Sequence, residues 1–249
     1  MKKIEETLII TSPDKKKIYT TIGYPERKSK TLVLFVHGLA STELWPTMLL
    51  GSWYFRKLGY AYCRINLYDW RPGARSLMTS DLLQHSLDVD TVAAVLQKKG
   101  FSKILAVGHS FGGLTLLQSN TAAFKAISLW DISSFISHPP KKRFKTVRSS
   151  GAIYLPGAYE LLMSDKFRQG MVNFPNELEL ISKIKIPTQI CYAAGKNAVL
   201  IESSKRYFKN LQTKKELVAI PNASHSFTEE GKSEQLFKKT DRWFRRFID

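Results

Sequence analysis

Short apolar stretches alternate with longer amphipathic stretches along most of this sequence. Thr31–Val36, Ile104–Val107 and Ala126–Trp130 are nearly continuous apolar runs, which is typical of strands buried on both faces of a sheet. From Asp81 to Lys99, apolar side chains recur near helical spacing. This alternation predicts an α/β fold in which a mostly parallel, doubly wound sheet has helices on both faces.

The same pattern predicts further elements toward both ends of the chain. Thr7–Ser12 and Lys17–Ile22, separated by Pro13-Asp14, predict an antiparallel hairpin. The remaining expected elements are a helix at Trp45–Leu58, strands at Tyr60–Leu67, Pro187–Ala193 and Glu216–Ile220, and a closing helix whose apolar stripe runs from Leu236 to Phe247. The last two strands complete the predicted sheet, and the closing helix packs against it.

The regular alternation breaks between residues 132 and 185. Pro139-Pro140 and further proline and glycine residues interrupt this stretch, in which we predict a helix from Tyr159 to Arg168. The stretch carries several aromatic side chains and is too apolar for a linker. We therefore divide the chain into a core of residues 1–131 and 186–249 and a cap or lid inserted at 132–185.

Length and composition indicate one large α/β domain. The chain has 249 residues, of which 43% are hydrophobic, enough for a full core. No run approaches the ~18 apolar residues of a membrane-spanning helix, and no apolar segment follows the basic residues at the start. We therefore expect neither integral membrane association nor a secretory signal. Cys63 and Cys191 lie in strand-like apolar runs, which favours buried free thiols and a cytoplasmic protein.

A formal net charge of +17 is the unusual feature of the composition. Such an excess is typical of proteins that bind nucleic acid, anionic membranes or acidic substrates. However, the basic residues are spread from Lys2 to Lys239, and no nucleic-acid-binding motif accompanies them. The densest basic run, from Lys141 to Arg148, is typical of a solvated loop. We therefore expect no nucleic-acid partner.

The candidate chemistry centres on Gly108-His109-Ser110-Phe111-Gly112. This G-x-S-x-G motif follows the strand predicted at Ile104–Val107 and precedes a helix-compatible stretch, the context in which a sharp turn exposes a nucleophilic serine. A serine hydroxyl is a weak nucleophile, so a neighbouring imidazole must accept its proton. His225, in the loop after the last predicted strand, is our candidate for that base and for the acid that protonates the leaving group.

With two further motifs, the sequence resembles the α/β-hydrolases, and specifically serine esterases and lipases with a cap insertion. His37-Gly38 after Thr31–Val36 resembles the oxyanion loop of that family, and Pro221–Phe227 resembles the loop bearing its catalytic histidine. The resemblance covers essentially the whole chain and implies the α/β-hydrolase fold. It also implies that the backbone N–H groups of Leu39 and Phe111 form the oxyanion hole.

The third member of the implied triad departs from the family pattern. Relatives usually carry an aspartate after the strand that corresponds to Thr188–Ala193, whereas this sequence has Asn197 at the best-matching position. Asp131 follows the preceding strand, where some relatives place the acid, and it is our first choice. Asn197 as an amide partner of the histidine, or another carboxylate such as Glu202 or Asp69, stays open, as does a degenerate site without activity.

We expect a serine hydrolase of the carboxylesterase class that cleaves a small-molecule ester or thioester through an acyl-enzyme on Ser110, with His225 as general base. Two alternatives stay open. One is a peptidase or amidase, in which acidic residues of the insert such as Glu160 and Glu177 would bind an amino terminus. The other is an α/β-hydrolase-like protein that binds a ligand without turnover.

Other sequence features bear on the ligand. Aromatic residues of the insert, such as Phe135, favour a substrate with an apolar part, and Lys141–Arg143 would favour an anionic one. The five histidines show no metal-ligand spacing, and HExxH and CxxC motifs are absent. We therefore expect neither a metal nor another cofactor. No sequence feature sets the oligomeric state.

Overall fold

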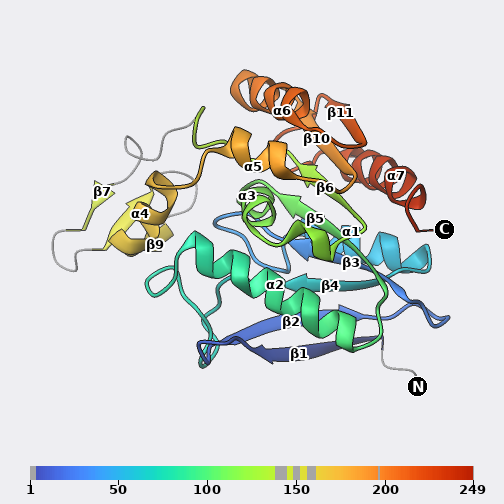
Figure 1. Ribbon diagram of the computed structural model, residues 1–249, viewed down its shortest axis with the longest axis horizontal. Helices are drawn as coiled ribbons and strands as arrows, with labels where there is room; N and C mark the ends of the chain where they lie inside the picture. Colours follow the sequence, from blue (N-terminus) through green and yellow to red (C-terminus); the bar gives the residue numbers. More distant parts are fainter. Residues whose placement is uncertain (1–3, 138–144, 148–151, 156–160, 196, 249) are drawn as a thin grey trace.

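The computed structural model describes residues 4–137, 145–147, 152–155, 161–195 and 197–248. The strands of its main sheet are β1 (Glu5–Thr11), β2 (Lys17–Gly23), β3 (Thr31–Val36), β4 (Ala61–Ile65), β5 (Lys103–His109), β6 (Ala126–Trp130), β10 (Thr188–Ala194) and β11 (Lys215–Pro221). Across the described sheet they follow the order β1-β2-β4-β3-β5-β6-β10-β11 (Figure 1). β2 pairs antiparallel with β1 and β4, and the remaining neighbours pair in parallel.

Helices cover both faces of this sheet (Figure 1). They are α1 (Pro46–Lys57), α2 (Leu82–Lys98), α3 (Phe111–Gln118), α6 (Ala198–Asn210) and α7 (Lys232–Arg245), with a 3-10 turn at Thr121–Ala123. Phe55 of α1 and Trp243 of α7 are buried in the core on one face. Val92 of α2, Leu114 of α3 and Tyr207 of α6 are buried in the core on the other. The predicted doubly wound α/β fold with a mostly parallel sheet is therefore confirmed.

Nearly all the predicted core elements match the structure to within two residues at each end. The helix predicted from Tyr159 to Arg168 is wrong, because Leu161–Met163 forms strand β9 and the helix α4 (Asp165–Val172) begins only after it. The hydroxyl of Ser164 accepts a hydrogen bond from the N–H of Phe167 and caps this helix at the later position. Residues 159 and 160 lie outside the described part of the chain.

The stretch from residue 132 to 185, which we call the β6–β10 segment, holds a second, smaller sheet. Its described elements are β7 (Lys145–Thr146), β8 (Ile153–Leu155), β9, α4 and α5 (Glu177–Lys183), and the three strands pair antiparallel in chain order. β7, β9 and α4 lie together at one end of the molecule (Figure 1). Phe167 of α4 is fully buried and stacks on Phe111 of α3 with ring centroids 5.9 Å apart. This segment therefore packs on the core, and its role as a cap stays a prediction.

The connections of the sheet switch direction at β3. The chain passes from β3 through α1 to β4 on one side, and then through α2 to β5 on the other side of β3. In open α/β sheets such a switch of direction leaves room for a ligand at the carboxyl ends of the strands. The turns after β3 and β5 carry His37-Gly38 and Ser110, so the fold brings the predicted motifs to one place.

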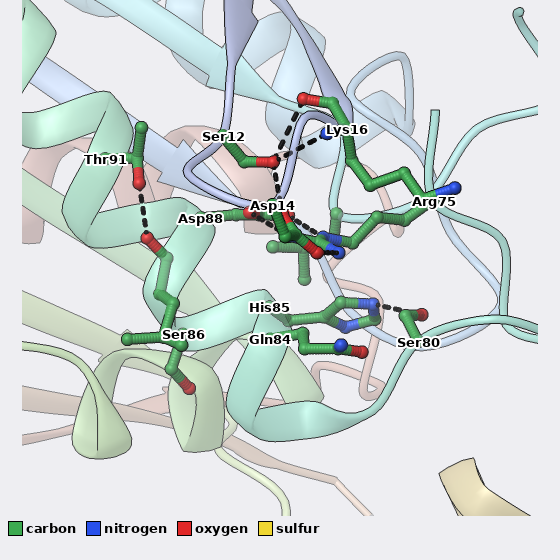
Figure 2. A network of polar contacts seen from close by, with 12 residues as sticks. Ser12, Asp14, Lys16, Arg75, Ser80, Gln84, His85, Ser86, Asp88 and Thr91 are labelled. Atoms are coloured by element: carbon green, nitrogen blue, oxygen red, sulfur yellow. Dashed lines mark hydrogen bonds and ion pairs between the residues drawn. The ribbon is translucent and has the colours of Figure 1, made fainter. Parts of the chain in front are cut away.

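A buried ion-pair network attaches the loop after β4 to its surroundings (Figure 2). The guanidinium of Arg75 binds both carboxylate oxygens of Asp88 on α2, at 2.6 and 2.9 Å, and both of Asp14 in the β1–β2 turn, at 2.7 Å each. The side chains of Arg75 and Asp88 are 5% and 2% exposed. Burial raises the pKa of Asp88, whereas hydrogen bonds from Arg75 hold the pKa of the more exposed Asp14 well below its usual range. One arginine thus connects hairpin, loop and helix.

Replacing Arg75 with methionine is expected to destabilise the fold strongly, because the carboxylate of Asp88 would stay buried without its partner. Breaking a buried pair in this way costs about 3–5 kcal/mol, which urea denaturation followed by circular dichroism would measure. Lys183→Met is the matched control, since it removes an exposed i,i+4 pair with Glu179 on α5 and should change the free energy of unfolding little. If Arg75→Met and Lys183→Met lowered the free energy of unfolding by the same amount, a special role for the Arg75 network would be contradicted.

Candidate active site

The candidate nucleophile Ser110 lies in a strained turn between β5 and α3. Its backbone adopts φ 55° and ψ −120°, a region that non-glycine residues rarely enter. Two close approaches explain the flanking glycines of the motif. A Cβ on Gly112 would lie 2.2 Å from the carbonyl oxygen of Val36, and one on Gly108 would lie 2.7 Å from the carbonyl oxygen of Gly112. Glycine at both positions therefore lets the turn close tightly against the end of β3.

Ser110, His225 and Asp131 form a continuous chain of hydrogen bonds. The Oγ atom of Ser110 lies 2.8 Å from Nε2 of His225, and Nδ1 of His225 lies 2.6 Å from Oδ2 of Asp131. Because an ionised carboxylate only accepts hydrogen bonds, Nδ1 of a neutral His225 carries the proton and Nε2 is free to accept one from Ser110. The structure thus brings together the three residues we predicted, and their catalytic role stays a prediction.

The carboxylate of Asp131 is held from several directions. Its side chain is 1% exposed, and its Oδ1 atom accepts a hydrogen bond of 3.0 Å from the N–H of Ala193 at the end of β10. Its own N–H donates to the carbonyl oxygen of Cys191 at 2.7 Å. His225, in contrast, has a side chain that is 39% exposed. A buried, hydrogen-bonded carboxylate therefore orients an imidazole that solvent can reach.

The loop after β3 passes directly beside Ser110. A Cβ on Gly38 would lie 3.2 Å from Cβ of Ser110, and Leu39 follows in this loop. Phe111 is the first residue of α3, where backbone N–H groups have no partner within the helix. This arrangement suits the predicted oxyanion hole, in which the N–H groups of Leu39 and Phe111 would bind the developing charge.

His37 and His109 occupy structural positions around the turn. Nε2 of His37 accepts a hydrogen bond from the N–H of Leu67, and Nδ1 donates to the carbonyl oxygen of Gly38. Nε2 of His109 lies 2.8 Å from the carbonyl oxygen of His225 and donates to it. Burial lowers the pKa of His37 to about 4 and that of His109 to about 3. Both rings therefore stay neutral near pH 7 and hold neighbouring loops in place.

The alternative partners for His225 have other contacts. The side chain of Asn197 caps α6 and accepts a hydrogen bond of 3.2 Å from the N–H of Leu200. Asp69 binds Arg71, and Glu202 binds Lys205. In this structure, the contact to Nδ1 of His225 is made by Asp131.

Sequence reasoning missed one side chain of this site, Ser133. Its hydroxyl lies 3.0 Å from Oγ of Ser110. Ser133 lies two residues after Asp131, in a stretch of ordinary polar composition. No motif in the sequence indicates that this serine meets the nucleophile turn.

A pocket of about 570 Å³ lies beside the loop after β3. Its walls come from three parts of the chain: Thr42, Glu43 and Leu44; the loop after β4 with Asn66, Tyr68, Asp69, Trp70, Arg71, Ser76, Leu77 and Met78; and Leu161 and Leu162 of β9. The hydroxyl of Tyr68 accepts a hydrogen bond from the N–H of Ser41, so one wall contacts the loop after β3 directly. Four of the lining side chains are large, apolar and exposed: Leu44, Trp70, Met78 and Leu162.

Some predictions concern other kinds of site. Within the described residues, no three His, Cys, Asp or Glu side chains are grouped so that they could hold a metal ion. Among those same residues, no helix is long and apolar enough to cross a membrane. The basic residues Lys141–Arg143 lie outside the described part of the chain. Cys63 and Cys191 are buried free thiols, as predicted.

A family model described as the alpha/beta hydrolase family matches residues 33–237. No curated protein matches the sequence significantly.

Solved structures resemble the whole chain at low sequence identity. Est1E from Butyrivibrio proteoclasticus with bound ferulic acid has a TM-score of 0.83 at 16% identity, and the match covers 97% of this chain and 99% of that one. The esterase domain of a Rhodothermus marinus protein has a TM-score of 0.76 at 15% identity, covering 98% and 99%. An α/β serine hydrolase without a lid from Xanthomonas campestris has a TM-score of 0.68 at 15% identity, covering 99% and 96%. At these identities the likeness shows the fold.

Buried neutral histidines predict a specific dependence of stability on pH. Burial lowers the pKa of His85 on α2 to about 3, close to the values for His37 and His109. An unfolded histidine has a pKa of about 6.5 and binds a proton as the pH falls below that value, while the folded ones do not. The free energy of unfolding should therefore be largest above pH 6.5 and fall between about pH 6.5 and 4, by up to about 1.4 kcal/mol per pH unit for each histidine.

His85→Leu isolates one of these contributions. The Ser80 hydroxyl, which contacts Nε2 of His85, keeps its hydrogen bond to the carbonyl oxygen of Ser76 in this variant. The free energy of unfolding, measured in urea between pH 5 and 6, should change less with pH than in the wild type. The difference in slope should correspond to one proton, about 1.4 kcal/mol per pH unit. An unchanged slope would show that His85 does not titrate on unfolding in this range.

Proposed function

The chain belongs to the alpha/beta hydrolase family, and we propose that it is a serine hydrolase that cleaves carboxylic esters through an acyl-enzyme on Ser110. The observation that carries this proposal is the hydrogen-bond chain from Ser110 through His225 to the buried carboxylate of Asp131. The same three side chains in this order would supply a nucleophile, a general base and the group that orients it.

The proposed reaction has two halves. In the first, Oγ of Ser110 attacks the ester carbonyl carbon while its proton moves to Nε2 of His225, and the N–H groups of Leu39 and Phe111 stabilise the oxyanion. The carbonyl re-forms, the bond to the leaving alcohol breaks, and His225 returns the proton to that alcohol. In the second half, water attacks the acyl carbon and gives a proton to Nε2 of His225. The bond between that carbon and Oγ then breaks, His225 returns the proton to Oγ, and the acid is released.

The pocket beside the loop after β3 supports a substrate with an apolar part. Its volume of about 570 Å³ is in the range of pockets that bind small molecules, and exposed apolar side chains gather around it. Its charged residues are Glu43, Asp69 and Arg71, so the net positive charge of the chain is not concentrated there. A neutral, apolar acyl group fits this lining better than an anionic one. Because β9 contributes Leu161 and Leu162, the β6–β10 segment would act as a cap over this pocket.

The contacts of the described acidic residues in the β6–β10 segment favour the esterase over the peptidase. The two acidic residues of the pocket, Glu43 and Asp69, contact Asn66 and Arg71. A peptidase that binds a free amino terminus needs carboxylates that face the substrate. Within the described residues, Glu177 is buried in contacts with the core, Glu179 pairs with Lys183, and Asp165 pairs with Arg168. Each of these carboxylates already has a partner inside the protein.

Substitutions in the triad test the proposal directly. Ser110→Ala should abolish hydrolysis of p-nitrophenyl esters, and Asp131→Asn should lower kcat by up to about 10⁴-fold, as loss of the aspartate does in a serine protease. Asn197→Ser keeps a side chain able to cap α6 and removes the amide, so it should retain activity. Activity that survives in Ser110→Ala, or that is lost in Asn197→Ser but kept in Asp131→Asn, would contradict this assignment.

Chain-length selectivity tests the pocket. We place the acyl chain of a long ester in this pocket, whose lining includes Trp70 and Leu162 but not Ser110. With p-nitrophenyl esters from acetate to decanoate, Trp70→Ala and Leu162→Ala should therefore lower kcat/KM for decanoate by about tenfold and leave acetate nearly unchanged. Methyl ferulate extends the series, since a structural neighbour binds ferulic acid. Trp53→Ala, which removes a half-exposed tryptophan on α1 outside this pocket, is the control. Equal effects on acetate and decanoate would argue against the pocket as the acyl site.

A further inference from the structure

We propose that Ser133 is a further catalytic residue, whose hydroxyl donates a hydrogen bond to Oγ of Ser110 and stabilises that oxygen when it leaves the acyl group. This inference rests on the proposed function of Ser110 as the nucleophile. It adds a role in one half of the reaction, the hydrolysis of the acyl-enzyme. The observation behind it is the 3.0 Å separation of the two hydroxyl oxygens.

The direction of this hydrogen bond follows from which atoms of His225 and Ser110 carry protons. Nδ1 of neutral His225 donates to Asp131, so Nε2 is an acceptor. Ser110 has one hydroxyl proton, and the contact of 2.8 Å with Nε2 uses it. Oγ of Ser110 can then only accept from Ser133. The donor in the contact between the two serines is therefore Ser133.

Ser133 is held in place by contacts that do not involve its side chain. Its N–H donates to the carbonyl oxygen of Ser110 at 3.2 Å. The hydroxyl of Tyr207 lies 3.2 Å from the carbonyl oxygen of Ser133 and also contacts the carboxylate of Glu177. Glu177 is 1% exposed and accepts hydrogen bonds from the hydroxyl of Ser134 and the N–H of Phe135. The backbone should thus keep its position when the hydroxyl of Ser133 is removed.

The hydroxyl of Ser133 matters most where Oγ of Ser110 gains charge. In the acyl-enzyme, Oγ is an ester oxygen and a weak acceptor. Water attacks the acyl carbon and gives one proton to Nε2 of His225, forming a tetrahedral oxyanion. When the carbonyl re-forms, the bond between carbon and Oγ breaks, its electron pair goes to Oγ, and His225 returns the proton to Oγ. The Ser133 proton stays on Ser133 and strengthens its hydrogen bond as the charge grows.

In acylation, the hydrogen bond from Ser133 has a different effect. Oγ of free Ser110 already accepts the hydrogen bond from Ser133 before the reaction, and its electron pair moves toward the substrate carbon during attack. The bond is therefore present at the start and does not strengthen. Only an interaction that is stronger in the transition state than in the preceding state raises a rate. Ser133 should accordingly accelerate deacylation and affect acylation little.

The two steps are measured separately with p-nitrophenyl dimethylcarbamate, which forms a slowly hydrolysed carbamoyl-enzyme. Release of p-nitrophenol reports acylation, and intact-protein mass with recovery of esterase activity after dilution reports deacylation. In Ser133→Ala, acylation should stay within about twofold of the wild type, and deacylation should slow about tenfold, the size expected for one hydrogen bond to a charged oxygen. Ser133→Thr, which retains a hydroxyl, should restore most of the deacylation rate.

The possible outcomes separate this inference from the proposed function. If acylation and deacylation slow equally in Ser133→Ala, the residue only positions Ser110, and the inference is wrong. Unchanged deacylation would overturn it as well. Wild-type protein that is not carbamoylated, or that is carbamoylated equally in Ser110→Ala, would overturn the proposed nucleophile and this inference with it. Thermal unfolding of each variant checks that the fold is intact.

Discussion

The close approach of α3 to the end of β3 is the constraint on which the rest of the candidate site depends. A side chain at Gly112 would overlap the carbonyl oxygen of Val36, so either the helix or the β3–β5 pairing would have to move. The contact keeps Ser110 at φ 55° and ψ −120°, and a Cβ on Gly38 in the loop after β3 would lie 3.2 Å from Cβ of Ser110. Backbone packing thus sets the position of the proposed nucleophile.

The end of β6 supplies a second set of contacts to the same turn. The carbonyl oxygen of Trp130 accepts from the N–H of Ser110, the carboxylate of Asp131 binds His225, and the N–H and hydroxyl of Ser133 both contact Ser110. β10, after which relatives usually carry the acid, supplies the N–H of Ala193 to the carboxylate instead. Since parallel strands end at the same edge of a sheet, an acid after either strand can reach the same imidazole.

Charge is distributed unevenly between surface and interior. No lysine of the described residues is buried, so much of the +17 charge is solvated and carries little structural cost. The buried Arg64 and Arg75 are each paired with carboxylates, and buried histidines stay neutral. These buried groups hold loops in place, whereas the imidazole of His225 is half-exposed and contacts Oγ of Ser110.

The sequence alone determined the order of the core elements, the α/β class and the turn around Ser110, because hydrophobic periodicity and glycine positions are local properties. It failed at Tyr159–Arg168, where pairing of Leu161–Met163 with β8 overrides a helical pattern. The three-dimensional arrangement was needed to show that Asp131, and not Asn197, contacts Nδ1 of His225, because each of the two residues follows a strand of the same sheet. The contact between Ser133 and Ser110 was also visible only in three dimensions. It depends on the relative position of the ends of β5 and β6, and no spacing of residues in the sequence indicates it.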